Sequence, residues 1–187
     1  MCIRDRGSGL TRLPEPDAGD LFFDLEGDPF AGETGLEYLF GWAEAPGGSS
    51  GDPIYGHVWA HDGPSEKAAF ERFIDLVMER GRRHPGMHVY HYAAYEPAAL
   101  KRLMGRYATR EQEVDELLRA EAFVDLYRVT RQALRAGVES YSIKELERFF
   151  REEDPLFELT PRSLANRRGS ATATLRRPRP PCSALRP

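Results

Sequence analysis

The sequence predicts an α/β fold in which a single mixed sheet carries helices on its faces. Three segments rich in aromatic and β-branched residues follow one another with short connections, which is typical of an antiparallel meander. An amphipathic helix and a further short strand come next, and a strand reached through a helix returns parallel to an earlier strand. We therefore expect three antiparallel strands followed by α/β crossovers, with the first strand central.

The first three strands are expected at residues 21–26, 36–45 and 54–61. The glycine-rich segment 47–53 is the turn between the second and the third. A helix should open at residues 64–65, because apolar side chains then recur every three or four residues. In this helix Glu66, Glu71 and Arg72 are expected to face water.

Shorter elements fill the second half of the domain. A strand is expected at 87–92, a helix follows with Pro97 in its first turn, and another helix carries Val114, Leu117 and Leu118. A last strand at 122–126 leads into a helix through Leu134 that Gly137 ends. The capping-box pattern of residues 142–145 then predicts a helix running to Phe150.

Both ends of the chain lack apolar periodicity. Residues 1–20 are expected to be a disordered leader or linker, and 151–187 a disordered Arg/Pro-rich tail. One domain, residues 21–150, remains between them, a size suited to a single core. The opening residues 1–6 resemble translated non-native sequence.

Composition excludes several classes of protein. No stretch approaches the roughly 20 apolar residues of a membrane span, and no secretory signal is present, so we expect a cytoplasmic protein without membrane contact. Cys2 and Cys182 cannot form a disulfide framework or a zinc ribbon.

The net charge of −4 divides into +7 for residues 159–187 and −11 for the remainder. Cations or a neighbouring domain would therefore have to attract nucleic acid to this acidic body.

Two carboxylates stand out in the apolar first strand, Asp24 and Glu26. Side chains alternate across a strand, so both acids share one face and Leu25 points to the other. Neighbouring acids repel each other, and a divalent cation between them makes the arrangement favourable. The pair predicts a metal site, although a solvated strand end would show the same triplet.

A third acid, Glu96, follows the expected strand at 87–92 and stands at the start of the next helix. If that strand lies beside the first one, Glu96 approaches Asp24 and Glu26. Three carboxylates at one sheet edge suit two divalent ions, which activate water and stabilise a leaving oxygen in phosphodiester hydrolysis.

These residues resemble the DEDD exonucleases of the ribonuclease H-like superfamily. Asp24 and Glu26 match the Asp-x-Glu motif of that family, and its second motif is echoed by His91, Tyr95 and Glu96. The sharper resemblance is to predicted RecB-family nucleases with a YprB-type ribonuclease H-like domain. It rests on four ordered segments, residues 23–29, 90–96, 124–127 and 141–147.

The resemblance implies a ribonuclease H-like fold and a nuclease that uses Mg²⁺ or Mn²⁺ with Asp24, Glu26 and Glu96 as ligands. It also implies a nucleic-acid substrate, DNA more than RNA, and a neighbouring RecB-like nuclease or helicase domain. In that family a fourth carboxylate lies on a later helix, yet this sequence has no acid after Glu158. Our hypothesis is that the reading frame is broken after about residue 150.

The remaining candidates each have two interpretations. Asp125 is either a catalytic or substrate-positioning acid or the cap of the helix that follows. His91 either orients substrate or Glu96, or is a satisfied core residue. Tyr95 is a candidate substrate contact, and Lys144 is either a phosphate contact or a solvated first-turn charge. Two functions remain open: a two-metal nuclease of the DEDD 3′–5′ exonuclease type, and a catalytically incomplete nucleic-acid-binding or docking domain.

Overall fold

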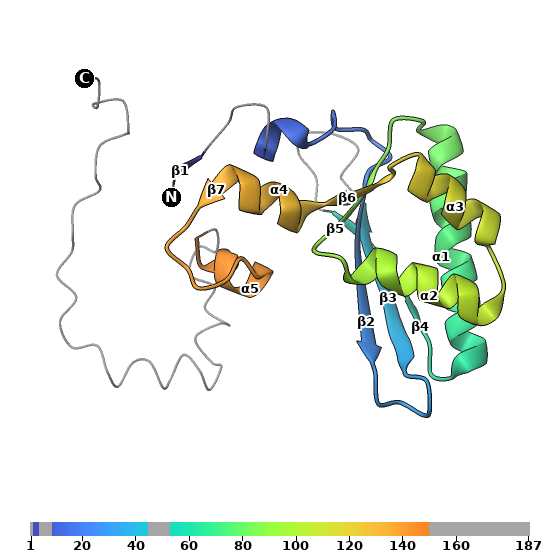
Figure 1. The fold of residues 1–187 in the computed structure, drawn as a ribbon. Coiled ribbons are helices and arrows are strands. Elements are labelled where there is room, and N and C mark those ends of the chain that lie inside the picture. The colour runs from blue at the N-terminus through green and yellow to red at the C-terminus, as the bar shows by residue number, and fades with distance from the viewer. Residues whose placement is uncertain (1, 4–8, 45–52, 150–187) are drawn as a thin grey trace, which may run out of the picture. The chain divides into compact units, whose positions relative to one another are not determined.

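The computed structural model describes residues 2–3, 9–44 and 53–149, and its main sheet has five strands in the order β4-β3-β2-β5-β6 (Figure 1). These strands are β2 (Leu21–Asp28), β3 (Leu36–Glu44), β4 (Ile54–Trp59), β5 (Val89–His91) and β6 (Phe123–Asp125). Strands β2, β3 and β4 are antiparallel, whereas β5 runs parallel to β2 and β6 runs parallel to β5. The predicted mixed α/β sheet with a central first strand is confirmed.

Three helices cover one face of this sheet (Figure 1). They are α1 (Gly63–Arg83), α2 (Tyr95–Tyr107) and α3 (Glu111–Arg119). Helix α1 begins with a reciprocal cap, because the Asp62 carboxylate accepts from the Ser65 amide at 2.8 Å and the Ser65 hydroxyl accepts from the Asp62 amide at 3.0 Å. The helix thus begins at Gly63, one residue before the start predicted at residues 64–65, and Asp62 is its cap.

The core lies between the sheet and these helices. Strand β2 alternates as its sequence predicts, with Leu21, Phe23 and Leu25 buried and the residues between them exposed. The Phe23 and Phe73 rings stack with centroids 3.9 Å apart. Each such buried side chain contributes about 1.5–3 kcal/mol to folding, so this contact anchors α1 to the central strand.

The prediction for Glu66 is wrong. Its side chain is fully buried and accepts hydrogen bonds from the Glu37 amide at 2.5 Å, from Arg106 Nη1 at 2.9 Å and from the Tyr107 hydroxyl. The apolar stripe of α1 correctly orients the helix on the sheet, but the end of α2 covers the flank that carries Glu66. A stripe within one helix cannot show which neighbouring helix will lie over its polar side.

The segments near the chain ends form structure that the sequence analysis did not anticipate. Helix α4 (Leu126–Ala133) contacts the 3₁₀ helix η1 (Gly9–Arg12). Strand β7 (Leu134–Arg135) pairs with β1 (Cys2–Ile3), so the helix predicted to reach Gly137 ends earlier. Asp20 is buried, and its Oδ1 accepts from the His88 amide at 2.8 Å. Residues 9–20 therefore contribute to the fold instead of forming an unstructured leader.

The described residues up to Glu145 belong to one compact unit, and the described residues from Leu146 onward belong to a second. Helix α5 (Ile143–Leu146) begins after Ser142 as its capping pattern predicts, and the 3₁₀ helix η2 (Glu147–Phe149) follows. The predicted tail at 151–187 lies outside the described residues. Among the helices that the structure describes, none combines the length and apolar content required to cross a membrane.

Candidate active site

Strand β2 places Asp24 and Glu26 on the face of the sheet opposite helices α1, α2 and α3. Both side chains are exposed, whereas Leu25 between them is buried in the core. Gly41 of β3 lies opposite Asp24 and contributes no side chain there. The two acids are therefore rigidly held by the central strand and open to solvent, which is the arrangement predicted from their spacing.

Glu96 lies near Asp24 of this pair, at the start of the helix that follows the neighbouring strand. It lies in the first turn of α2, just after β5, which is the parallel neighbour of β2. Burial, followed by the charge of Glu96, raises the pKa of the Asp24 carboxyl. The Glu96 side chain is only 5% exposed, and its Oε2 has no hydrogen-bond partner among the described residues. A buried carboxylate oxygen without a donor is costly unless a cation binds it.

His91 lies beside that oxygen. Its Nδ1 lies 3.5 Å from Glu96 Oε2, but neither atom makes a hydrogen bond within the described part of the chain. Both side chains are buried, and the edge of the His91 ring contacts Phe123 with centroids 6.3 Å apart. His91 therefore lies beside the Glu96 carboxylate without forming a hydrogen bond to it.

The turn that carries Glu96 is held by Asp125. Its Oδ1 accepts from the Ala93 amide at 3.0 Å and also from the amides of Tyr127 and Arg128 at the start of α4. Ala93 adopts φ = 73°, a left-handed conformation that costs an L-residue about 1–2 kcal/mol. Asp125 thus caps α4 and stabilises the strained turn between β5 and Glu96.

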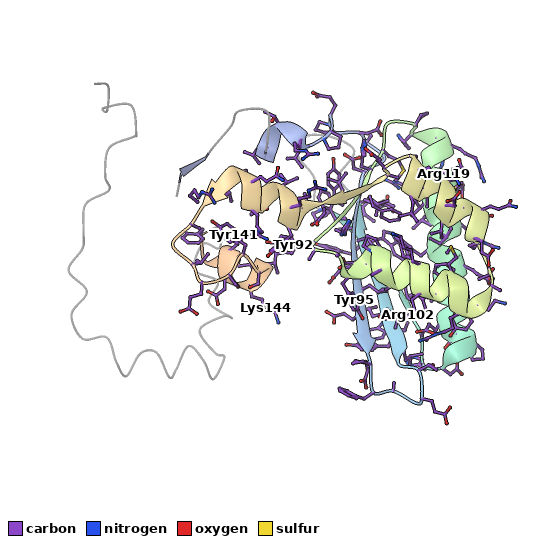
Figure 2. All side chains as sticks on the ribbon, in the orientation of Figure 1. Tyr92, Tyr95, Arg102, Arg119, Tyr141 and Lys144 are labelled. Atoms are coloured by element: carbon purple, nitrogen blue, oxygen red, sulfur yellow. The ribbon has the colours of Figure 1, made fainter. Side chains whose placement is uncertain are left out.

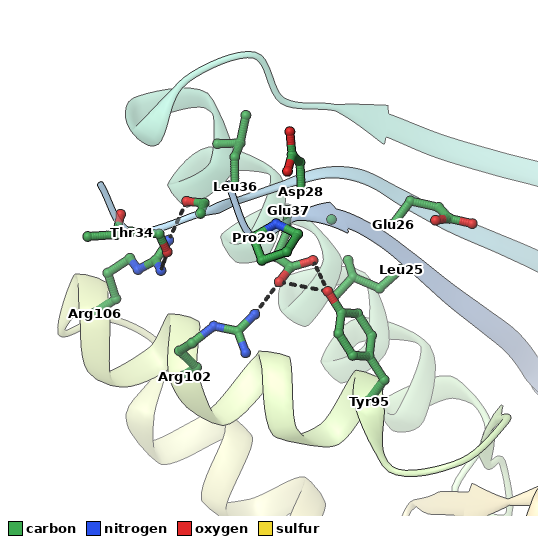
Figure 3. Close-up of a pocket in the computed structure, with 12 residues that line it drawn as sticks. Leu25, Glu26, Asp28, Pro29, Thr34, Leu36, Glu37, Tyr95, Arg102 and Arg106 are labelled. Carbon is green, nitrogen blue, oxygen red and sulfur yellow. Dashed lines mark hydrogen bonds and ion pairs between the residues drawn. The ribbon is translucent and has the colours of Figure 1, made fainter. Parts of the chain in front are cut away.

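A pocket of about 500 Å³ opens beside Glu26 (Figure 3). Its wall includes Glu37, which is buried, and the Tyr95 hydroxyl donates to both Glu37 carboxylate oxygens at 3.1 and 2.9 Å. Arg102 Nη2 forms an ion pair with the same carboxylate. Burial and Glu37 raise the pKa of Tyr95, so its hydroxyl remains a donor at neutral pH.

Gly27 makes room for this network at a bulge in β2. The register between β2 and β3 shifts between Glu26 and Gly27. A Cβ atom at Gly27 would lie 2.2 Å from Glu37 Oε2 and 2.7 Å from the Tyr95 hydroxyl oxygen. The missing side chain therefore lets Glu37 and Tyr95 pack directly against the strand next to Glu26.

Of the other predicted substrate contacts, Lys144 is exposed on α5, whereas Tyr95 at the start of α2 lines the pocket beside Glu26 (Figure 2). The Tyr92 hydroxyl donates to the Tyr141 carbonyl, which ties the end of β5 to the segment before α5. This bond keeps Tyr92 in a structural role.

The donor chemistry of the carboxylates suits a divalent cation, because hard cations prefer carboxylate oxygens. The unpartnered oxygen of Glu96 and the repulsion between Glu96 and Asp24 would both be relieved by such an ion. However, the described residues contain no group of three or more His, Cys, Asp or Glu side chains gathered closely enough to hold one. The chemistry therefore fits a metal, whereas the ligand set within the described ranges is incomplete.

Sequence reasoning missed four residues near the site: Glu37, Glu66, Arg102 and Arg106. Arg102 and Arg106 stand one helical turn apart on α2, six and ten residues after Glu96, and this spacing was the available signal. Their partners lie 65 and 40 residues away in the sequence, so the pairing itself could not be deduced.

Comparison with known proteins gives one positive result. A family model described as the RNase H superfamily matches residues 21–156, which is more than half of the chain. The searches of curated proteins and of solved structures give no match. The five-stranded mixed sheet with flanking helices is consistent with this family.

Proposed function

Since this chain belongs to the RNase H superfamily, we propose that it is a metal-dependent nuclease module that hydrolyses phosphodiester bonds of DNA or RNA. Membership of the superfamily suggests nuclease-like activity, and RNase H-like domains bind nucleic acids. The observation that carries the proposal is the approach of Glu96, buried and with an unpartnered oxygen, to Asp24 on the open face of β2.

In this proposal Asp24, Glu26 and Glu96 hold Mg²⁺ or Mn²⁺. When bound, such ions activate a water molecule and stabilise the leaving oxygen. Asp24 and Glu26 provide carboxylates on a rigid strand that does not need to rearrange on binding. Asp125 acts as a positioning residue, because it holds the turn from which Glu96 projects. His91 provides a ring nitrogen beside Glu96 and limits how that carboxylate can rotate.

The finer assignment is to the DEDD 3′–5′ exonucleases, within a larger RecB-like protein that carries a YprB-type domain. It is supported by the order of the four sequence segments at residues 23–29, 90–96, 124–127 and 141–147. The acidic charge of the body supports a role for metal ions or a neighbouring domain in attracting the substrate. Under this assignment DNA is the preferred substrate.

The test combines metal binding with nuclease activity. Thermal unfolding of the wild-type chain should shift upward with Mn²⁺, by about 5–10 °C at a hundredfold excess over the dissociation constant. Asp24→Asn and Glu96→Gln should abolish that shift. Asp115→Asn is the matched control, because Asp115 is an exposed acid of α3 that pairs with Arg119. Its metal response should equal that of the wild type.

Activity is measured on single-stranded DNA labelled at its 5′ end, with Mn²⁺ or Mg²⁺. A 3′–5′ exonuclease produces a ladder of labelled products, whereas an endonuclease produces internal fragments. Cleavage that survives Asp24→Asn and Glu26→Gln would reject the roles assigned to these acids.

A second candidate function is a catalytically incomplete nucleic-acid-binding or docking domain. It is favoured by the incomplete ligand set in the part of the chain that the structure describes. This alternative predicts nucleic-acid binding that Mn²⁺ does not enhance, with no thermal shift and no cleavage products.

A further inference from the structure

We propose that the pocket beside Glu26 is a phosphate-binding subsite in which Arg102 contacts the backbone of a nucleic-acid strand. The inference rests on the proposed function, since it assigns the pocket to a phosphodiester next to the one that is hydrolysed. It adds Arg102 to the site as a substrate-binding residue, held in place by Glu37 and Tyr95.

Two arginines of the same helix differ in how fully they are paired. Arg106 is occupied, because it donates to Glu66 at 2.9 Å and to the carbonyl oxygens of Gly35 and Thr34, and its side chain is 21% exposed. Arg102 donates to Glu37 through Nη2 and interacts with the Tyr95 hydroxyl group, and its side chain is 46% exposed. Arg106 thus has a structural role, whereas the more exposed guanidinium of Arg102 keeps N–H donors for a ligand.

The second terminal nitrogen of Arg102 is directed away from Glu37. Figure 3 shows one terminal nitrogen of Arg102 turned toward Glu37 and the other turned away from it. A planar guanidinium with free donors binds phosphate oxygens better than an ammonium group does, because two parallel hydrogen bonds can form. Arg102 and Glu26 both line the pocket, so the guanidinium shares this cavity with one of the proposed metal ligands.

The Arg102 guanidinium is held in place before any ligand binds. Glu37 is buried, and the Tyr95 hydroxyl fixes both of its oxygens, so the ion pair with Arg102 has one geometry. Gly27 is required for this packing, since a side chain there would collide with Glu37 and Tyr95. Holding a flexible arginine in place beforehand reduces the entropy lost on binding.

The size and charge of the pocket restrict its occupant. A volume of about 500 Å³ accommodates a nucleotide unit. Glu26 and Asp28 also line the pocket, and they would repel a free anion. We therefore expect a phosphate that is delivered as part of a strand and attracted with the help of cations at the carboxylates, whereas free inorganic phosphate should bind poorly.

The test measures binding of a fluorescent single-stranded oligodeoxynucleotide by anisotropy, with Ca²⁺ and then with EDTA. Arg102→Gln should weaken binding about tenfold, which is the loss expected for a charge-assisted hydrogen bond. Arg102→Lys should recover part of the loss, because it keeps the charge but not the fork. Arg119→Gln is the matched control, since Arg119 is 80% exposed on α3 and pairs with Asp115 (Figure 2). It should bind like the wild type.

Two readouts separate substrate contact from a structural role. Loss of one phosphate contact should reduce the slope of log K against log salt by about 0.7. In a series of oligonucleotides, each carries one neutral methylphosphonate at a different position. Wild-type affinity should fall more at one of these positions than at the others. Arg102→Gln should be insensitive at that position. The Glu37→Gln/Arg102→Gln double variant removes the buried uncompensated charge, so a folding defect in the single variant cannot explain the result.

The outcomes distinguish the two proposals. If Arg102→Gln binds with wild-type affinity and wild-type salt slope, the phosphate subsite is wrong and the nuclease proposal is unaffected. If the wild type binds nucleic acid through Arg102 but shows neither a Mn²⁺ response nor cleavage, the subsite stands and the metal-dependent nuclease is wrong. If the wild type binds no DNA or RNA, both are wrong.

Discussion

The buried ion pair between Glu66 and Arg106 provides the sharpest test of the structure. The Glu66 side chain is 0% exposed, and Arg106 supplies its counter-charge at 2.9 Å. Arg106→Gln would leave a buried carboxylate that still accepts from the Glu37 amide and the Tyr107 hydroxyl. Removing one partner of a buried pair costs about 3–5 kcal/mol, and the two remaining donors favour the lower end. At about 3 kcal/mol the melting temperature should fall by about 6–12 °C.

The assay is urea unfolding monitored by tryptophan fluorescence and circular dichroism. Arg110→Gln is the control, because Arg110 pairs with Asp75 at 2.8 Å on the surface and should cost at most about 1 kcal/mol. The Glu66→Gln/Arg106→Gln double variant should recover most of the loss, since the amide oxygen can accept from the Glu37 amide and the amide nitrogen can donate to the Tyr107 hydroxyl oxygen. If Arg106→Gln unfolds within about 0.5 kcal/mol of the wild type, the buried position of Glu66 is refuted.

Asp24, Gly27 and Phe73 each allow a further test of the site and the core. The pKa of Asp24 is raised from its ordinary value of 3.8, so without metal the folded state loses stability as pH rises above that value. Asp24→Asn should therefore match the wild type in EDTA below about pH 4 and be more stable at pH 7, and a less stable variant at pH 7 would contradict this. Gly27→Ala should lower stability by about 1–3 kcal/mol, because its Cβ would lie 2.2 Å from Glu37 Oε2; an unchanged urea midpoint would argue against the close packing. Phe73→Ala should cost about 3–5 kcal/mol, since it empties a fully buried position stacked on Phe23; the midpoint should fall with an unchanged denaturant slope, and a loss below 1 kcal/mol would refute the stacking.

Two buried polar side chains, Glu96 and His91, connect the proposed metal site to the stability of the fold. Glu96 and His91 are both buried, and their facing atoms lie 3.5 Å apart without a hydrogen bond among the described residues. Native proteins satisfy most buried polar groups, and the exceptions concentrate where a ligand completes the site. The site is therefore expected to be less stable without a cation than with one, which agrees with the direction of the Asp24 pKa.

Local sequence pattern was sufficient for the class of fold. The alternation of apolar and polar residues in β2 follows from the backbone of a strand, so it predicted that Asp24 and Glu26 share an exposed face. The crossover through a helix predicted that β5 returns parallel to an earlier strand, and the structure pairs it with β2, which brings the turn before Glu96 to the same sheet edge. These inferences succeeded because they depend on backbone geometry and on neighbours in the chain.

Only the tertiary structure decided how the charges are paired. Glu66 has the spacing of a solvated residue on α1, yet it is buried because Arg106 and Tyr107 reach it from α2. Glu37 is buried for the same reason, with Arg102 and Tyr95 as its partners. Burying a carboxylate is favourable only where a cationic side chain and hydrogen-bond donors pack against it. These partners lie far away in the sequence, so the local periodicity of the sequence does not show the contact.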